Sequence, residues 1–428
     1  MQLFPWMNQR GPGGPRRFFR PLEGDQAGCF RKHLLSAVAG GISMGVVLNH
    51  EYIAVNGLGA SPWQVTALTM MWPVSNILSV FINHWLDSRG RWDRAVLLFG
   101  VITRLPVMLM FFSSSVNLML LLLLFFFASN SVILPAQNSI IKKRYSDSQR
   151  ARLYGWWIST FTLFSLPVAM LAGALLDMDF QYYRMLFVVE GVFGAGQAVF
   201  LSLMARGMRS EVAEREEGRG SGHFLRSLWN VFRKDRDFAW FEIYFFLYGI
   251  AFLMILPVIP FFATERLKLD YEQYAMAKGV IGQLGILFLS PMLGVRLERL
   301  HPFRFTGVVC IILAFYPLSM ALGSWFPSAG TFLFYLAFAI YALGMAGIKI
   351  SWDISSLQFA PPGQEATYQG LHVTMTALRA SFAPILGSLL LYFGGYAQAF
   401  LVSSAFFALA GVLFLRRYSR RRAQGAIA

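Results

Sequence analysis

Residues 83–94 read NHWLDSRGRWDR, and six of these twelve residues are Asp, Arg or His. The stretch lies between two strongly apolar runs, WQVTALTMMWPVSNILSVFI (63–82) and AVLLFGVITRLPVMLMFF (95–112). About 20 apolar residues are enough to cross the hydrocarbon core of a bilayer as a helix. The charge cluster is therefore expected to be a polar joint between two membrane-spanning helices, which predicts a chain that folds in lipid.

The composition excludes a chain made only of soluble domains. Hydrophobic residues make up 56% of the 428 residues and charged residues only 14%, whereas a soluble domain carries roughly 25% charged residues. The net charge of +15 would suit nucleic acid in a soluble protein. Most Lys and Arg residues instead fall in joints between apolar runs, which favours membrane topology and anionic lipid as the explanation. We expect no nucleic-acid partner.

Apolar runs of spanning length recur along the whole chain. Each is expected to be helical, because lipid offers no hydrogen-bond partner for backbone polar groups. The twelve predicted spans cover residues 33–56, 63–86, 95–113, 116–140, 152–176, 184–205, 238–263, 272–296, 303–324, 331–357, 368–391 and 395–415. The predicted fold class is an all-α integral membrane protein with twelve transmembrane helices.

Lys and Arg are distributed very unevenly over the joints between these spans. Of the 37 residues, 30 fall in the termini and the alternate joints on one side, three on the other side and four within spans. Such an excess marks the cytoplasmic side, so both termini are predicted to be cytoplasmic. Residues 1–32 are basic and rich in Pro and Gly, without the apolar core of a signal peptide. The expected location is the inner (plasma) membrane of a bacterium.

The longest joint, residues 206–237, is highly charged and contains GRGSG. We interpret it as a cytoplasmic linker between two halves of six spans each, either partly ordered or with a short amphipathic surface helix in HFLRSLWNVFRK. The predicted domains are a cytoplasmic N-terminal tail (1–32), an N-terminal half (33–205), this linker, a C-terminal half (238–415) and a basic cytoplasmic C-terminal tail (416–428).

The two halves share sequence patterns. GVRLERLHP (294–302) stands in the second half where the opening joint stands in the first, with Glu298 at the place of Asp87. LYGWWISTFTLFSLPVAMLAGALL (153–176) and YQGLHVTMTALRASFAPILGSLL (368–390) share an early Gly, Thr-x-Thr, a mid-span Pro, a later Gly and Leu-Leu. A parallel repeat of six spans is typical of secondary transporters whose halves rock against each other.

The motif DSRGR (87–91) carries a resemblance to a known family. It is similar to the G-x-x-x-D-R-x-G-R-R signature that follows the second span in the major facilitator superfamily. The chain departs from that signature where Asn83, Ser88 and Trp92 replace its first Gly, its first Arg and its last basic residue. Together with the span count, the central linker and the repeat, the motif implies the fold of that family over residues 33–415, and with it a transporter.

The resemblance also implies a cytoplasmic gate that holds the two halves together. By it, Asp87, Gly90 and Arg91 would form the gate in the first half, and Glu298 with Arg299 its degenerate copy. Asp87 would face the start of the eleventh span, where a carboxylate interacts favourably with a helix N-terminus. The alternative is that the Arg residues of the joint only anchor it on the cytoplasmic side.

Ionisable residues inside the predicted spans are candidates for binding a substrate or protons, because burying a charge in lipid is costly. The candidates are His50, Glu51, Arg104, Glu190, Lys278, Lys349, Asp353, His372 and Arg379. Glu51 is placed first, because it lies about 200° around its helix from the small-residue stripe that ends at Asn49. The alternative interpretation is that Glu51 simply lies at the outer membrane interface, where its span ends.

Alternatives remain open for the other candidates. Arg104 could pair with Glu51 or bind an anion, and Lys278 could face a cavity or extend outward to the interface. Lys349 and Asp353 are four residues apart and could pair within one helix. Arg379 could neutralise Asp353 or hold an anion.

No enzyme signature, metal-ligand cluster or cofactor motif occurs, and the two cysteines are too few for a disulfide framework. The sequence therefore predicts a non-enzymatic monomer without cofactor or metal that moves a small molecule by alternating access. Coupling to protons is expected through Glu51 or Glu190, with the direction of transport open. The alternatives are a transporter-like sensor or partner protein without net flux, and a lipid flippase.

Overall fold

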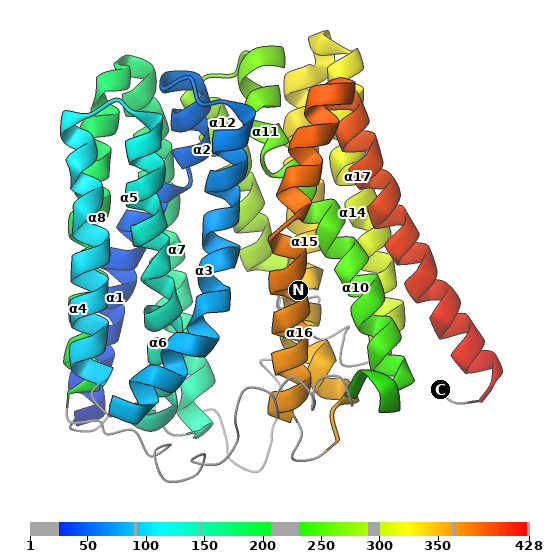
Figure 1. The fold of residues 1–428 in the computed structure, drawn as a ribbon, viewed down its shortest axis with the longest axis horizontal. Coiled ribbons are helices and arrows are strands. Elements are labelled where there is room, and N and C mark those ends of the chain that lie inside the picture. The colour runs from blue at the N-terminus through cyan, green and yellow to red at the C-terminus, as the bar shows by residue number, and fades with distance from the viewer. Residues whose placement is uncertain are drawn as a thin grey trace, which may run out of the picture.

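The computed structural model describes residues 25–89, 92–145, 147–206, 231–289, 300–361 and 365–425, and within these ranges it is built from helices and turns. The elements form two bundles that stand side by side (Figure 1). The first bundle comprises α1 (Asp25–Val47), α2 (His50–Tyr52), η3 (Ile53–Gly57), α3 (Pro62–Arg89), α4 (Trp92–Arg104), η4 (Leu105–Phe112), α5 (Val116–Ala128), α6 (Asn130–Arg144), α7 (Asp147–Met178), η5 (Phe180–Tyr182) and α8 (Tyr183–Ala205). The second comprises α10 (Arg236–Ile255), α11 (Val258–Phe261), η7 (Phe262–Arg266), α12 (Tyr271–Ala275), η8 (Met276–Ile281), α14 (Pro302–Trp325), η9 (Pro327–Ala329), α15 (Gly330–Phe359), α16 (Glu365–Ala380) and α17 (Ala383–Ala423).

The molecule has two ends. The tail end is where α1 begins and α17 finishes, and the opposite end carries η3, η7 and the start of α12 (Figure 1). Within the described residues, nine helical segments are long and apolar enough to cross a membrane. One of them, Tyr368–Ala423, contains two crossings, because Gly395 has φ 70° and ψ −174° and turns the chain back. The order of the elements is consistent with the twelve predicted spans.

Irregular turns interrupt several spans. Pro106 has no backbone N–H and its ring crowds the preceding turn, so the α-helix α4 ends at Arg104 and continues as the 3₁₀ segment η4. The segments η3 and η8 are π-helical turns, a feature that often marks functional sites in helices. η3 begins two residues after Glu51, and Lys278 lies within η8.

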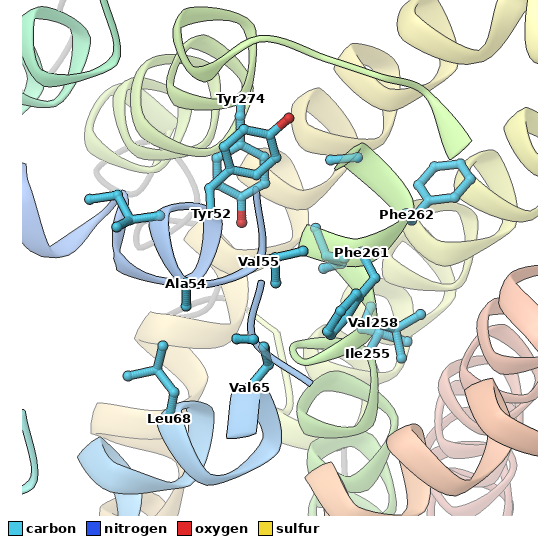
Figure 2. Packing of buried hydrophobic residues seen from close by; sticks show 14 of the residues in the cluster. Tyr52, Ala54, Val55, Val65, Leu68, Ile255, Val258, Phe261, Phe262 and Tyr274 are labelled. Carbon is cyan, nitrogen blue, oxygen red and sulfur yellow. The ribbon is translucent and has the colours of Figure 1, made fainter. Parts of the chain in front are cut away.

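The halves share one hydrophobic core at the opposite end. Figure 2 shows Tyr52, Val55 and Val65 from the first half close to Phe261 and Tyr274 from the second. The rings of Tyr52 and Tyr274 stack with centroids 4.4 Å apart and an interplanar angle of 15°. Burial of this apolar surface between the halves holds the opposite end closed in this structure.

Several predicted features fall outside the described residues. The tail 1–24 and the linker segment 207–230 are among them. Four residues of the predicted gate also lie outside the described residues: Gly90, Arg91, Glu298 and Arg299. Asp87 lies in α3, but its side chain is not described. The gate therefore stays a prediction. The predicted basic C-terminal tail is helical through Ala423, as the end of α17.

Gly387 is expected to be intolerant of a side chain. A Cβ at this position in α17 would lie 1.6 Å from the carbonyl oxygen of Met254 in α10, so Gly387→Ala must separate the two helices. We expect a loss of roughly 1–3 kcal/mol of stability, measured as a lower melting temperature in detergent. Gly155→Ala in α7 is the control, since no atom lies within 4 Å of its Cβ. Equal melting temperatures for both variants would contradict the close packing of α10 on α17.

Candidate functional site

Arg104 is at the centre of a polar cluster inside the first half. Its side chain is 4% exposed, and the guanidinium donates to four acceptors. These are Ser129 Oγ (2.8 Å), the Gly194 carbonyl (2.9 Å), Gln197 Oε1 (2.7 Å) and Asn130 Oδ1 (3.1 Å). Arg104 also lies over the ring of Phe126, 5.1 Å from its centroid. The fork geometry of a guanidinium suits this arrangement, in which one cation joins three helices.

Glu190 and His50 form a buried acid–imidazole pair next to this cluster. His50 Nε2 hydrogen-bonds with Glu190 Oε2 at 2.6 Å, and both side chains are almost completely buried. His50 also stacks on Phe187, with ring centroids 5.3 Å apart. Glu190 Oε1 and His50 Nδ1 have no partner among the described residues. A carboxylate and an imidazole in hydrogen-bond contact share one proton between them.

Glu51 and Lys278 form an ion pair between the halves. Lys278 Nζ contacts Glu51 Oε2, and Tyr274 donates its hydroxyl to the same oxygen at 3.3 Å. The two side chains are 19% and 23% exposed, respectively, so the pair is only partly removed from solvent. Lys278 lies in the π-helical turn η8, and Glu51 lies two residues before the π-helical turn η3. Such turns alter where side chains point relative to a regular helix. The attraction between the two halves at this point therefore depends on the charge of the Glu51 carboxylate.

A second buried acid–imidazole pair lies in the other half. His372 Nδ1 hydrogen-bonds with Glu242 Oε1 at 2.7 Å, with both side chains at most 1% exposed. Glu242 Oε2 and His372 Nε2 have no partner among the described residues. Glu242 lies about 9 Å into α10 from the tail end, whereas Glu190 lies about 10 Å into α8 from the opposite end. The two pairs thus lie at different depths, one in each half.

Arg379 is packed beside this second pair. It donates to the Phe245 carbonyl and to Thr376 Oγ1 (3.2 Å), and its guanidinium lies over the rings of Phe245 and Tyr248, 5.1 and 5.6 Å from their centroids. A Cβ on Gly249 would come within 2.0 Å of Arg379 Nε, so this glycine provides the space that the guanidinium occupies. Arg379 is a packed structural cation in this conformation, with Phe245 and Thr376 as its hydrogen-bond partners.

The structure brings some of the predicted residues together and separates others. The suggested pairing of Arg104 with Glu51 is not formed, because Arg104 is held by neutral acceptors and Glu51 by Lys278. Lys278 points toward Glu51 of the other half and does not extend outward to the membrane interface. Lys349 is exposed in α15, and the side chain of Asp353 is outside the description, so their pairing stays a prediction.

Glu242 was missed, although the sequence contained a signal for it. It is a lone carboxylate in the apolar run FAWFEIYFFLYG (238–249), and the same cost of burial that singled out Glu190 applies to it. Asp177 was also missed. It lies in the last turn of α7, where a negative charge is unfavourable for its own helix, which indicates a partner on another element.

Asp177 caps a helix that belongs to the other half. Its two carboxylate oxygens accept the backbone N–H groups of Tyr271 and Glu272, each at 2.8 Å. These groups begin α12, where a carboxylate is favoured by the helix dipole. Gly173, one turn earlier in α7, permits the approach, because a Cβ there would lie 2.9 Å from the Tyr271 carbonyl oxygen. Asp177 and Gly173 together hold the start of α12 against the end of α7, at the opposite end of the molecule.

Two further hydrogen bonds join the halves at the same end. Thr66 in α3 and Ser388 in α17 hydrogen-bond through their hydroxyls, and the Tyr52 hydroxyl donates to the Leu269 carbonyl. Among the described residues, the hydrogen bonds and ion pairs that cross between the halves lie at this end or at Glu51–Lys278. The structure thus shows a two-half membrane protein that is closed at the opposite end.

Comparison with known families agrees with this architecture. A family model described as Major Facilitator Superfamily matches residues 34–384. The chain belongs to the major facilitator superfamily. The predicted resemblance and the helical fold class are therefore confirmed, and the protein is a multi-pass integral membrane protein. A search of curated protein sequences found no significant match.

Solved structures of other superfamily transporters share the fold at low sequence identity. The nucleoside transporter NupG is 14% identical, with a TM-score of 0.69 over 92% of this chain and 99% of NupG. A POT family transporter in complex with 5-aminolevulinic acid is 13% identical, with a TM-score of 0.72 over 92% and 95% of the two chains. A bacterial homologue of the human lysosomal transporter Spinster, in an inward-facing and occupied conformation, is 15% identical, with a TM-score of 0.69 over 92% and 97%. At these identities, the shared property is the fold.

Proposed function

We propose that this superfamily member is a secondary active transporter that moves a small organic solute across the membrane by alternating access. The proposal rests on the interface between the two halves, which we call the seam. It is closed at the opposite end by Asp177 on α12 and by the Thr66–Ser388 hydrogen bond. Rocking of the halves would break these contacts, separate the apolar core between the halves and open that end, as the repeat of six spans allows. The excess of Lys and Arg supports a cytoplasmic tail end.

Protons are the proposed coupling ion, with Glu51 as the residue that senses them. While Glu51 is charged, its attraction to Lys278 across the seam favours the closed opposite end. Protonation of Glu51 removes this attraction, so opening of the opposite end becomes less costly. The buried Glu190–His50 pair supplies a second group, in the same half, that can hold a proton.

Glu51→Gln tests the coupling because glutamine keeps the shape of the side chain but carries no titratable group. For one proton per solute, an imposed gradient of one pH unit is expected to drive about tenfold accumulation of solute in wild-type proteoliposomes. The variant is expected to equilibrate the solute without accumulating it.

A thermal-shift screen of the purified protein identifies the solute for this test. Its first set is nucleosides, peptides and 5-aminolevulinic acid, which the names of the structural neighbours mention.

The matched control for this experiment is Glu272→Gln, which removes an exposed carboxylate near the same end of the molecule. It should accumulate solute as wild type does. Accumulation by Glu51→Gln at the wild-type level would refute the role of Glu51 while leaving the transporter proposal intact.

A further inference from the structure

A polar recess lies at the tail end, and its described lining residues all belong to the second half. It has a volume of about 650 Å³ and is formed where α10 and α16 begin and α17 finishes (Figure 1). The lining residues are Lys234, Asp235, Arg236, Asp237, Pro361, Tyr368, Arg417 and Arg421. All of these described residues lie at the tail end, away from the contacts between the halves at the opposite end, where solute transport is proposed.

Both carboxylates of the recess are already engaged by its own groups. Asp237 forms ion pairs with Arg417 (2.7 Å) and with Arg421. Asp235 caps α10 by accepting the Phe238 N–H at 2.9 Å, and it accepts the Tyr368 hydroxyl at 3.0 Å. The four cations in the lining outnumber the two carboxylates, so the recess keeps a net positive charge.

Donor groups remain in this lining after those contacts are made. Arg417 Nε and Arg421 Nε are buried atoms with no hydrogen-bond partner among the described residues. Lys234 and Arg236 are exposed at the rim. Since Arg417 and Arg421 are four residues apart on α17, both guanidinium groups face the same side of the helix, where Asp237 already orients them. Two oriented guanidinium groups with free N–H donors match the several acceptor oxygens of a phosphate.

The recess also lies at the depth of lipid headgroups. The apolar run of α17 ends at Leu415, and the next residues, RRYSRRR (416–422), contain five arginines. Basic residues directly after a spanning helix attract anionic lipid, and basic pockets between such helices bind lipid head groups. We propose that the recess binds a phosphate group, supplied by the headgroup of an anionic phospholipid or by a free phosphate ester.

Native mass spectrometry of the full-length protein in detergent tests the proposal with defined probes. The protein is titrated with dioleoyl phosphatidylglycerol, with dioleoyl phosphatidylcholine as the lipid of no net charge. Arg417→Gln/Arg421→Gln is expected to weaken phosphatidylglycerol binding by roughly tenfold or more, because it removes the two guanidinium groups of the recess that would donate to the phosphate. Lys234→Gln/Arg236→Gln should weaken phosphatidylglycerol binding to a similar extent. This variant leaves the ion pairs of Asp237 intact, so its weaker binding cannot be explained by misfolding caused by loss of those pairs.

The matched control is Arg416→Gln/Arg420→Gln, which has the same spacing and the same change in charge on exposed positions of α17. It should change phosphatidylglycerol affinity by less than about twofold, since these side chains are not in the recess. The proposal is overturned if the control weakens binding as much as the recess variants do, or if phosphatidylglycerol binds no more tightly than phosphatidylcholine.

Competition with inorganic phosphate and glycerol 3-phosphate distinguishes the two sources. If millimolar concentrations of either displace phosphatidylglycerol from wild type, a free phosphate ester can be the ligand. If neither displaces the lipid, the ligand is the headgroup held together with its acyl chains. Both results support a phosphate site.

Discussion

Replacing Arg104 by methionine is expected to destabilise the protein by about 3–5 kcal/mol, the largest loss for any single side chain discussed here. Methionine fills similar space but leaves Gln197, Asn130 and the Gly194 carbonyl without their donor in a buried environment. It also removes a permanent positive charge near the buried Glu190. A decrease of roughly 10 °C in the melting temperature of the detergent-purified protein would be the expected observation.

Two further variants separate the role of the guanidinium from the role of its charge. Arg104→Lys keeps the charge but lacks the planar fork, so it should recover at most about half of the lost stability. Arg94→Met, at an exposed position early in α4, should melt within about 2 °C of wild type. If Arg104→Met also melts within that range, the cluster does not hold the first half together as described.

Locking the opposite end with a disulfide is expected to stop transport. The contact between the Thr66 and Ser388 hydroxyls places their Cβ atoms within roughly 5 Å of each other, close to the geometry of a disulfide. Thr66→Cys/Ser388→Cys should therefore crosslink on oxidation when the buried native Cys29 and Cys310 are replaced by alanine. Because the bond joins the two halves, it blocks the rocking motion, and solute exchange should fall to the background rate.

A disulfide inside one half is the control for this experiment. Thr306 and Ser351, in α14 and α15, also have hydroxyls in hydrogen-bond contact, at 2.6 Å. Thr306→Cys/Ser351→Cys should crosslink with little effect on exchange, because both residues move with the same half. The mobility of each oxidised protein on a gel without reductant reports whether its crosslink formed.

Hydropathy and charge pattern predicted the architecture because both reflect the bilayer directly. The number and spacing of spans follow from the thickness of the hydrocarbon core, and the repeated Thr-x-Thr, Pro and Gly positions indicated two related halves before any contact was known. The bend at Gly395 and the 3₁₀ segment after Arg104 were less predictable, since their bounds depend on packing against neighbouring helices.

For the site, the sequence indicated which residues are costly to bury but not which residues meet. Arg104, Glu190 and His50 come from three elements far apart in the chain, so their contacts depend on how α4, α8 and α2 pack. Glu51 was the first candidate for binding a substrate or protons, but its contact with Lys278 of the other half was not predicted. The contact of Asp177 with α12 depends on the conformation of the whole transporter, which no local pattern encodes.

The measurement that tests alternating access most directly is the rate of solute exchange by Thr66→Cys/Ser388→Cys in proteoliposomes, before and after reduction of one sample. The solute is the one that most stabilises the wild-type protein in the thermal-shift screen. We predict no exchange above background by the oxidised protein and recovery to the rate of the cysteine-free protein once reductant is added. Equal exchange by the crosslinked and the reduced protein would contradict transport by rocking of the two halves.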